Sequence, residues 1–155
     1  MKILVIGDSH GNVANLKHVM GFAKKIGITQ VIHTGDWNNI KSVNAVVESD
    51  VESLAAVVGN ADIDEDMQKL KKDFLKAFKD SMELYLDGRR IYITHRFKKD
   101  DNNHIGKDIV FTGHYHSQKV WEQDGVKIVR PGALEKDINF VIYDTKTNDV
   151  ELINL

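Results

Sequence analysis

Seven residues whose side chains can bind metal ions lie in five short segments of the 155-residue chain. Together they offer imidazole, carboxylate and amide groups, while the absence of cysteine excludes thiolate ligands and cysteine nucleophiles. Imidazole with carboxylate and without thiolate suits Mn, Fe, Co, Ni or Zn. The candidate ligands are Asp8, His10, Asp36, Asn60, His95, His114 and His116.

The spacing of these residues indicates how they could share ions. Asp8 and His10 are two residues apart, as are His114 and His116. Because residues i and i+2 point the same way in extended backbone, we expect each pair to face one ion. Seven ligands exceed the three or four of a single catalytic ion and suit two ions about 3.5–4 Å apart. A bridging carboxylate is then needed, and Asp36 is the candidate.

Such a site predicts phosphate-ester hydrolysis. Two divalent ions outweigh the charges of Asp8, Asp36 and a bridging hydroxide, so the site attracts a phosphate oxyanion. The ions would lower the pKa of bound water from about 15.7 towards about 7 and supply a hydroxide nucleophile. The sequence shows no Ser/His/Asp or Cys/His arrangement that would do the same work.

The elements that must position these residues follow from the hydrophobic pattern. The first half alternates short β-branched runs with segments of helical spacing. We predict strands at 2–7, 30–34 and 54–58 and helices at 13–26, 42–47 and 66–79. The inner face of the last helix would carry Met67, Leu70, Phe74 and Phe78.

The second half predicts hairpins. Asp-Gly pairs at 87–88 and 124–125 are strong turn signals, and residues 145–148 form a third predicted turn. The strands are expected at 81–86, 89–94, 108–112, 119–123, 126–130, 138–144 and 149–152. All five ligand segments directly follow a predicted strand, and ligands of open α/β sheets bind beyond the carboxyl ends of strands.

At these residues the chain resembles the calcineurin-like metallophosphoesterase superfamily, whose motifs are D-x-H, GD, GN, H and GH-x-H in this order. The closest likeness is to its compact bacterial and archaeal phosphodiesterase branch. The matching residues are Asp8-Ser9-His10, Gly35-Asp36, Gly59-Asn60, His95 and Gly113-His114-Tyr115-His116.

The resemblance implies one α/β domain over residues 1–155, a four-layer α-β-β-α sandwich of two mixed sheets flanked by helices. It implies two divalent transition-metal ions, from among Mn, Ni, Co, Fe and Zn, and hydrolysis of small or nucleotide-like phosphodiesters. One ion would be held by Asp8, His10, Asp36 and His116, and the other by Asp36, Asn60, His95 and His114.

The chain departs from the family pattern around the substrate pocket. Arg96 stands where glycine is usual, residues 96–112 form a shortened segment, and Arg130–Ala133 replace an Asn-Pro-Gly-Ser segment. Both arginines are candidate phosphate ligands. Ala61 replaces a histidine that donates a proton to the leaving group in the protein-phosphatase branch. Asn60 and Asp62 are the remaining catalytic candidates, Asp62 by orienting a metal ligand or water.

The composition argues against some classes of binding partner. The net charge of −2 and the lack of a basic stripe argue against a nucleic-acid partner. The sequence has no apolar span of 18 residues, so we expect no membrane helix. The first apolar run is too short for a signal peptide. We therefore expect a cytoplasmic protein acting on a small phosphate ester. An exposed hairpin edge near the C-terminus could pair two chains as a homodimer.

Other interpretations remain open from sequence. Asp8 and Asp36 precede helices and could be N-cap residues, Asn60 could be a turn residue, and His95 could be a core histidine. His33 is expected to be structural or to support a ligand, and His104 could reach the site from a short lid. The alternative functions are a weakly catalytic metal-binding scaffold of the same fold, as in a eukaryotic retromer subunit, and a nuclease.

Overall fold

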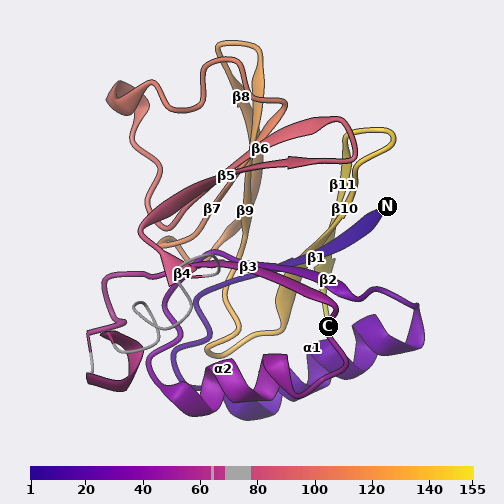
Figure 1. Ribbon diagram of the computed structural model, residues 1–155, viewed down its shortest axis with the longest axis vertical. Coiled ribbons are helices and arrows are strands. Elements are labelled where there is room, and N and C mark those ends of the chain that lie inside the picture. Colours follow the sequence, from indigo (N-terminus) through magenta and orange to yellow (C-terminus); the bar gives the residue numbers. More distant parts are fainter. Residues whose placement is uncertain (64, 69–77) are drawn as a thin grey trace.

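Two β-sheets packed face to face form the centre of the computed structural model, which describes residues 1–63, 65–68 and 78–155. Helices α1 and α2 lie together beneath one sheet, on the side away from the other sheet (Figure 1). Both sheets contain parallel and antiparallel pairs. The predicted α/β class with two mixed sheets is confirmed; of the two expected helical layers, the described residues show the one formed by α1 and α2.

The first sheet has six strands in the order β11-β10-β1-β2-β3-β4. Neighbours from β1 to β4 are parallel, whereas β10 and β11 run antiparallel at the other edge. The strands are β1 (Lys2–Ile6), β2 (Gln30–His33), β3 (Ser53–Val57), β4 (Phe78–Lys79), β10 (Asn139–Asp144) and β11 (Asp149–Asn154).

The second sheet has five strands in the order β5-β6-β7-β9-β8. Its centre, β6-β7-β9, is parallel, and a hairpin partner flanks it on each side. The strands are β5 (Ser81–Leu86), β6 (Arg89–Thr94), β7 (Ile109–Thr112), β8 (Gln118–Gln123) and β9 (Val126–Pro131).

Alternation along β1 explains the layers. Ile3 and Val5 face the second sheet and pack with residues such as Phe111, whereas Leu4 and Ile6 face the helices. A strand with apolar residues on both faces is buried on both sides, as β1 is from Ile3 onward. The two cores therefore fix the register of β1, and with it the position of the chain beyond Ile6.

Both helices begin at asparagines. Asn12 caps α1 (Val13–Lys25) by accepting a hydrogen bond from the Asn15 N–H, and Asn39 caps α2 (Ile40–Val47) in the same way. The alternative interpretation of Asp8 and Asp36 as N-cap residues is therefore wrong, since neither carboxylate caps a helix.

The predicted helix at 66–79 is wrong at its end. Residues 65–68 are helical and Met67 is buried, but residues 78–79 form β4, a parallel partner of β3. The Val58 N–H donates to the Lys79 carbonyl, which continues the pairing of β3 with β4. Residues 69–77, with Leu70 and Phe74, lie outside the described residues.

The outer face of the five-stranded sheet differs from the face covered by α1 and α2. Within residues 1–63, 65–68 and 78–155 it carries no α-helix, only the short 3-10 helix η1 (Lys99–Asp101) in the loop between β6 and β7. Residues 96–112, all of which are described, thus hold no α-helix. No helix in that part is long and apolar enough to cross a membrane.

Candidate metal centre

Five strands bring the predicted ligands to one edge of the molecule. The parallel strands β1, β2 and β3 end just before Asp8, Asp36 and Asn60, and β6 and β7 end before His95 and His114. The loops are bonded to one another: the Asp8 N–H donates to the Gly35 carbonyl, and the Gly113 N–H donates to the His95 carbonyl. The parallel pairing therefore brings together residues that are distant in sequence.

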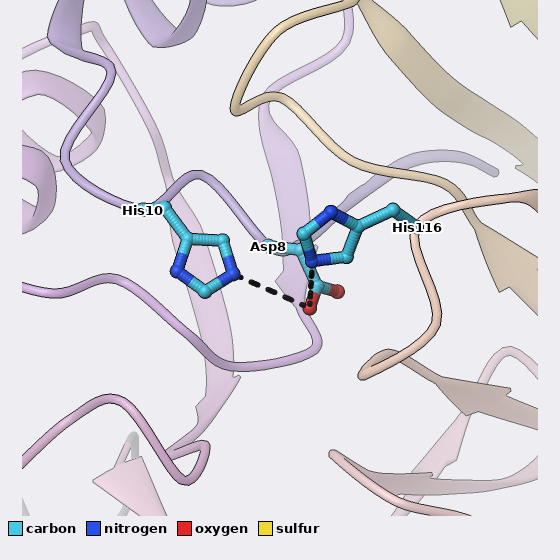
Figure 2. A group of neighbouring side chains, drawn as sticks. All are labelled: Asp8, His10 and His116. Carbon is cyan, nitrogen blue, oxygen red and sulfur yellow. Dashed lines mark ion pairs between the residues drawn. The ribbon is translucent and has the colours of Figure 1, made fainter.

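One group of ligands surrounds the buried Asp8 carboxylate (Figure 2). Its Oδ1 lies 4.0 Å from His10 Nε2 and 3.7 Å from His116 Nε2. One ligand atom from each of these three residues lies within 4.8 Å of the others, a spacing that can hold a metal ion. Asp36 adjoins this group, because its Oδ2 is 3.4 Å from His10 Nε2.

A second group also includes Asp36, and Asp8 is close to it, because ligand atoms of Asp8, Asp36 and His95 lie within 4.8 Å of one another. Asp36 Oδ2 is 3.3 Å from His95 Nε2, which is also 2.9 Å from the Asn60 amide oxygen. His114 Nδ1 lies 3.0 Å from that amide oxygen. Asp36 Oδ1 accepts a hydrogen bond from the Ala61 N–H, so a single oxygen, Oδ2, faces both groups.

The pairs Asp8/His10 and His114/His116 do not have the extended backbone that their spacing led us to expect. Asp8 and His10 do face one group, but at φ of 47° and 43° rather than in extended backbone. His114, at φ 74°, turns towards Asn60, whereas His116 turns towards Asp8. The shared ion expected for the second pair from spacing is thus contradicted, and the split implied by the family resemblance fits the geometry.

Backbone strain is concentrated at the candidate ligands. Asp8, His10, Asp36 and His114 all have positive φ, which costs a non-glycine residue roughly 1–3 kcal/mol. The surrounding hydrogen bonds oppose this cost, as when the His10 N–H donates to the Asp36 carbonyl. Close packing adds to the constraint, because a Cβ on Gly59 would lie only 2.0 Å from Asp36 Oδ1.

An unsatisfied nitrogen shows that the side chains fit a cation. His10 Nε2 is buried and has no hydrogen-bond partner within the described part of the chain. It faces two carboxylates instead, and buried polar atoms are normally satisfied. Imidazole and carboxylate groups that converge in this way suit a divalent transition metal.

The electrostatics of the site favour binding of positive charge. Burial raises the pKa of Asp8 to about 7, against the opposing charge of His95. For Asp36, burial alone would raise the pKa, but hydrogen bonds from His95 and the Ala61 N–H outweigh it and lower the pKa. The pKa of His114 is lowered by burial and by the charges of His95 and Arg96, which favours the neutral imidazole that binds metals.

Asp62 does not point towards the ligand groups but holds the loops that carry them. Its carboxylate accepts hydrogen bonds from the N–H groups of Asp36, Asn38 and Gly59, at 2.8–3.0 Å. Burial raises its pKa despite these bonds. Of the two roles considered from sequence, orienting a metal ligand fits this geometry, through the backbone of Asp36.

Three other groups that support the site were not singled out as ligands. The Thr34 carbonyl lies 2.9 Å from His95 Nδ1, which fixes the orientation of that ring. Glu135 Oε2 lies 3.4 Å from His116 Nδ1 in the same way. His33 is fully buried, stacks on Trp37 and accepts from the Gly35 N–H, so it supports the loop of Asp36. Glu135 belongs to none of the five ligand segments, so the sequence pattern did not predict its contact with His116.

The remaining candidates lie at the rim. Arg96 is exposed, and its charge acts on His114. Arg130 donates hydrogen bonds to the carbonyl and hydroxyl oxygens of Ser117 and stacks on Tyr115. His104 does not reach the ligand groups as a lid residue could; it is buried and bonds Asp124 at 2.8 Å.

Comparison with known families agrees with this arrangement. Residues 1–148 match the model of the calcineurin-like phosphoesterase superfamily domain. The chain belongs to this superfamily. Membership implies divalent metal ions as cofactors and phosphoesterase chemistry in general. No curated protein sequence matches the chain.

Solved structures with the same fold include phosphoesterases and the protein Vps29. An archaeal phosphodiesterase is 23% identical with a TM-score of 0.84, and each chain is covered in full. The E. coli phosphoesterase YfcE is 19% identical with a TM-score of 0.72, covering 99% of this chain and 98% of its own. Zinc-complexed Vps29 from Entamoeba histolytica is 16% identical with a TM-score of 0.66, at 100% and 98% coverage.

Proposed function

We propose that this protein is a phosphodiesterase that uses two divalent transition-metal ions to hydrolyse small or nucleotide-like phosphate esters. The observation that carries this proposal is the position of Asp36 Oδ2, 3.4 Å from His10 Nε2 and 3.3 Å from His95 Nε2. One oxygen facing two ligand groups fits a carboxylate that bridges two ions. Asp8, His10 and His116 would complete one ion site, and Asn60, His95 and His114 the other.

When bound, the two ions would lower the pKa of a water molecule and stabilise the charge on the phosphorus oxygens. The chain itself contributes position and orientation. Asp62 holds the loops of Asp36 and Asn60, while the Thr34 carbonyl and Glu135 orient His95 and His116. Water loses a proton to solvent and forms the new P–O bond, the P–O bond to the leaving group breaks, and the leaving oxygen departs with the electron pair.

Residue 61 supplies no general acid to protonate the leaving group. Ala61 cannot donate a proton, and loss of a general acid costs about 10²–10⁴-fold in rate. Esters with acidic leaving groups should therefore react much faster than alkyl esters. A rate that does not depend on the pKa of the leaving group would contradict this account of Ala61.

The experiment is hydrolysis of paired chromogenic substrates, bis(p-nitrophenyl) phosphate and p-nitrophenyl phosphate, by protein stripped of metal and reloaded singly with Mn, Ni, Co, Zn or Mg. Turnover should require metal and favour the diester. Asp36→Ala and His95→Ala should each abolish it, whereas His18→Ala, an exposed histidine on α1, should not.

A metal-binding scaffold is the second candidate function, because Ala61 removes an acid and the fold is shared with Vps29. Metal binding alone does not separate the two functions. If two ions bind per chain and no ester is turned over with any of the five metals, the result would favour the scaffold function and overturn the proposed phosphodiesterase function.

A further inference from the structure

A cavity of about 560 Å³ opens beside the candidate metal centre, on the outer face of the five-stranded sheet. Its walls come from the loop after β6, the end of β7, and strands β8 and β9. Small-molecule sites commonly have volumes of about 300–1,000 Å³. The cavity lies where the shortened 96–112 segment leaves the sheet without a covering helix.

The lining combines aromatic and cationic side chains. The lining includes three cationic residues, Lys99, Lys119 and Arg130, and one acidic residue, Glu122, so this small area is positive although the whole chain has a net charge of −2. Three aromatic residues share the same walls, and a cavity of this composition suits a ligand that is both flat and anionic. They are Phe97, Tyr115 and Trp121.

The aromatic and cationic groups are held in contact with one another. The Arg130 guanidinium lies 5.0 Å from the Tyr115 ring centre and 5.8 Å from that of Trp121, and Lys119 Nζ lies 5.3 Å from the latter. Ser117 accepts two hydrogen bonds from Arg130 and fixes it. The site is therefore largely formed without a ligand.

Contacts between the loop after β6 and the β8–β9 hairpin stabilise the outer rim of the cavity. The His104 ring packs edge-on against Phe97, whose ring in turn meets Trp121. His104 Nε2 lies 2.8 Å from Asp124 in the turn between β8 and β9. This contact ties the loop that carries Phe97 and Lys99 to the hairpin that carries Trp121.

The cavity and the metal centre share a wall. Gly113 lines the cavity, and a Cβ on it would lie 2.7 Å from Asp8 Oδ2. Tyr115 stands between two candidate ligands, and its ring packs edge-on against that of His114. A phosphodiester held at the centre could thus extend its second ester group into the cavity.

We propose that this cavity binds the non-leaving side of the substrate, and that this group is a nucleoside carrying a second phosphate. The base would stack on Trp121 and Tyr115, and the second phosphate would meet Lys119, with Lys99 nearby. This inference rests on the proposed phosphodiesterase function and narrows its substrate class. The subsite would lie on the outer face of the five-stranded sheet, whereas α1 and α2 cover the outer face of the six-stranded sheet.

Three chromogenic diesters with the same leaving group test the proposal. They are methyl p-nitrophenyl phosphate, thymidine 5′-(p-nitrophenyl phosphate), and the same thymidine ester with a 3′-phosphate. In each, water forms the new P–O bond, p-nitrophenolate leaves with the electron pair, and the proton goes to solvent. We expect kcat/KM to rise by about tenfold from the first to the second, since stacking of one base contributes that much, and by about threefold to the third.

Two variants separate the two contacts. Trp121→Ala should lower the thymidine-to-methyl ratio of kcat/KM by about tenfold. Lys119→Ala, at an exposed position, should leave that ratio near the parent's and remove the gain from the 3′-phosphate. Lys41→Ala, an exposed lysine on α2, is the matched control and should change neither ratio. Equal kcat/KM for all three esters, or ratios unchanged in both cavity variants, would overturn the subsite while leaving the phosphodiesterase intact.

A binding measurement keeps the two proposals distinguishable if no ester is hydrolysed. Trp37 is fully buried, so fluorescence changes on titration with thymidine 3′,5′-bisphosphate would report on Trp121. Saturable quenching that is weakened by Lys119→Ala, and not reproduced by inorganic phosphate, would support the subsite even though the proposed function had failed. Absence of quenching would overturn it.

Discussion

At the scale of single residues, the site depends on side chains held in unfavourable backbone conformations. Four candidate ligands have positive φ, and glycines next to them allow the loops to approach closely. The residue types could be read from sequence, because they recur after strands in a known order. The way each side chain points could not, since the period of two that applies to extended backbone fails where φ is positive.

Gly59 offers a direct test of this packing. An alanine Cβ there would lie 2.0 Å from Asp36 Oδ1 and 2.6 Å from its backbone nitrogen, so Gly59→Ala should displace Asp36. We expect metal affinity to fall at least tenfold by calorimetry. Gly21→Ala is the control: it meets nothing within 4 Å on helix α1 and should stabilise the fold by about 0.5–1 kcal/mol. Unchanged metal affinity in Gly59→Ala would argue against Asp36 as a ligand.

Asp8 predicts a pH dependence of metal binding. Its pKa in the metal-free protein is raised to about 7, so below that pH an incoming ion must displace a proton. Metal affinity should therefore fall as pH falls below about 7, and more protons should be released at pH 6 than at pH 8. Calorimetry in two buffers with different ionisation enthalpies measures this release. An Asp8→Asn variant should lose the share due to Asp8 and keep that of His95, whose pKa is also raised, against the effect of burial, by its hydrogen bond to Asp36; equal release at both pH values in the parent would contradict the assignment.

At the scale of elements, strands and hairpins were largely predictable, and one segment was not. Hairpins with an Asp-Gly turn follow from local residue preferences, and β5, β6, β8 and β9 lie within a residue of their expected bounds. Strand β4 has only two residues, and its pairing with β3 is non-local, so nothing in its own sequence signals it. The caps of α1 and α2 were also misjudged, because Asn12 and Asn39 lie closer to the helices than the aspartates considered.

Asp62 connects the loops after β2 and β3, and its removal should damage both. Asp62→Ala would leave three N–H groups without their acceptor, of which that of Asp36 is buried, at about 1–3 kcal/mol for each that water cannot reach. We expect a loss of roughly 2–4 kcal/mol in the free energy of unfolding by urea denaturation, together with weaker metal binding.

Asp62→Asn is the informative companion, because its amide keeps one acceptor oxygen and should restore part of the stability. If Asp62→Ala folded as stably as the parent and lost only turnover, Asp62 would act in the chemistry and not through the loops.

At the scale of the whole molecule, the candidate centre joins the two sheets. Asp8, Asp36 and Asn60 follow strands of the first sheet, whereas His95 and His114 follow strands of the second. The sequence order of motifs predicted this meeting, because the carboxyl ends of parallel strands gather at one edge. The cavity beside the centre could not be foreseen, since it depends on how residues 96–112 lie over β8 and β9.

Metal should therefore stabilise the whole fold. An ion that binds only the folded state adds about 2.7 kcal/mol when its concentration is a hundred times its Kd. Thermal unfolding of metal-free protein should shift upward by several degrees when Mn is added, and the shift should disappear in Asp36→Ala, which removes the carboxylate common to both sites. A shift that persists in that variant would place the stabilising ion elsewhere.

The central claim is that two ions flank Asp36, and anomalous diffraction from crystals grown with Mn tests it most directly. We predict two anomalous peaks per chain, about 3.5–4 Å apart, one beside Asp8, His10 and His116 and the other beside Asn60, His95 and His114. A single peak on one side of Asp36, or peaks only away from these seven residues, would contradict the dinuclear account.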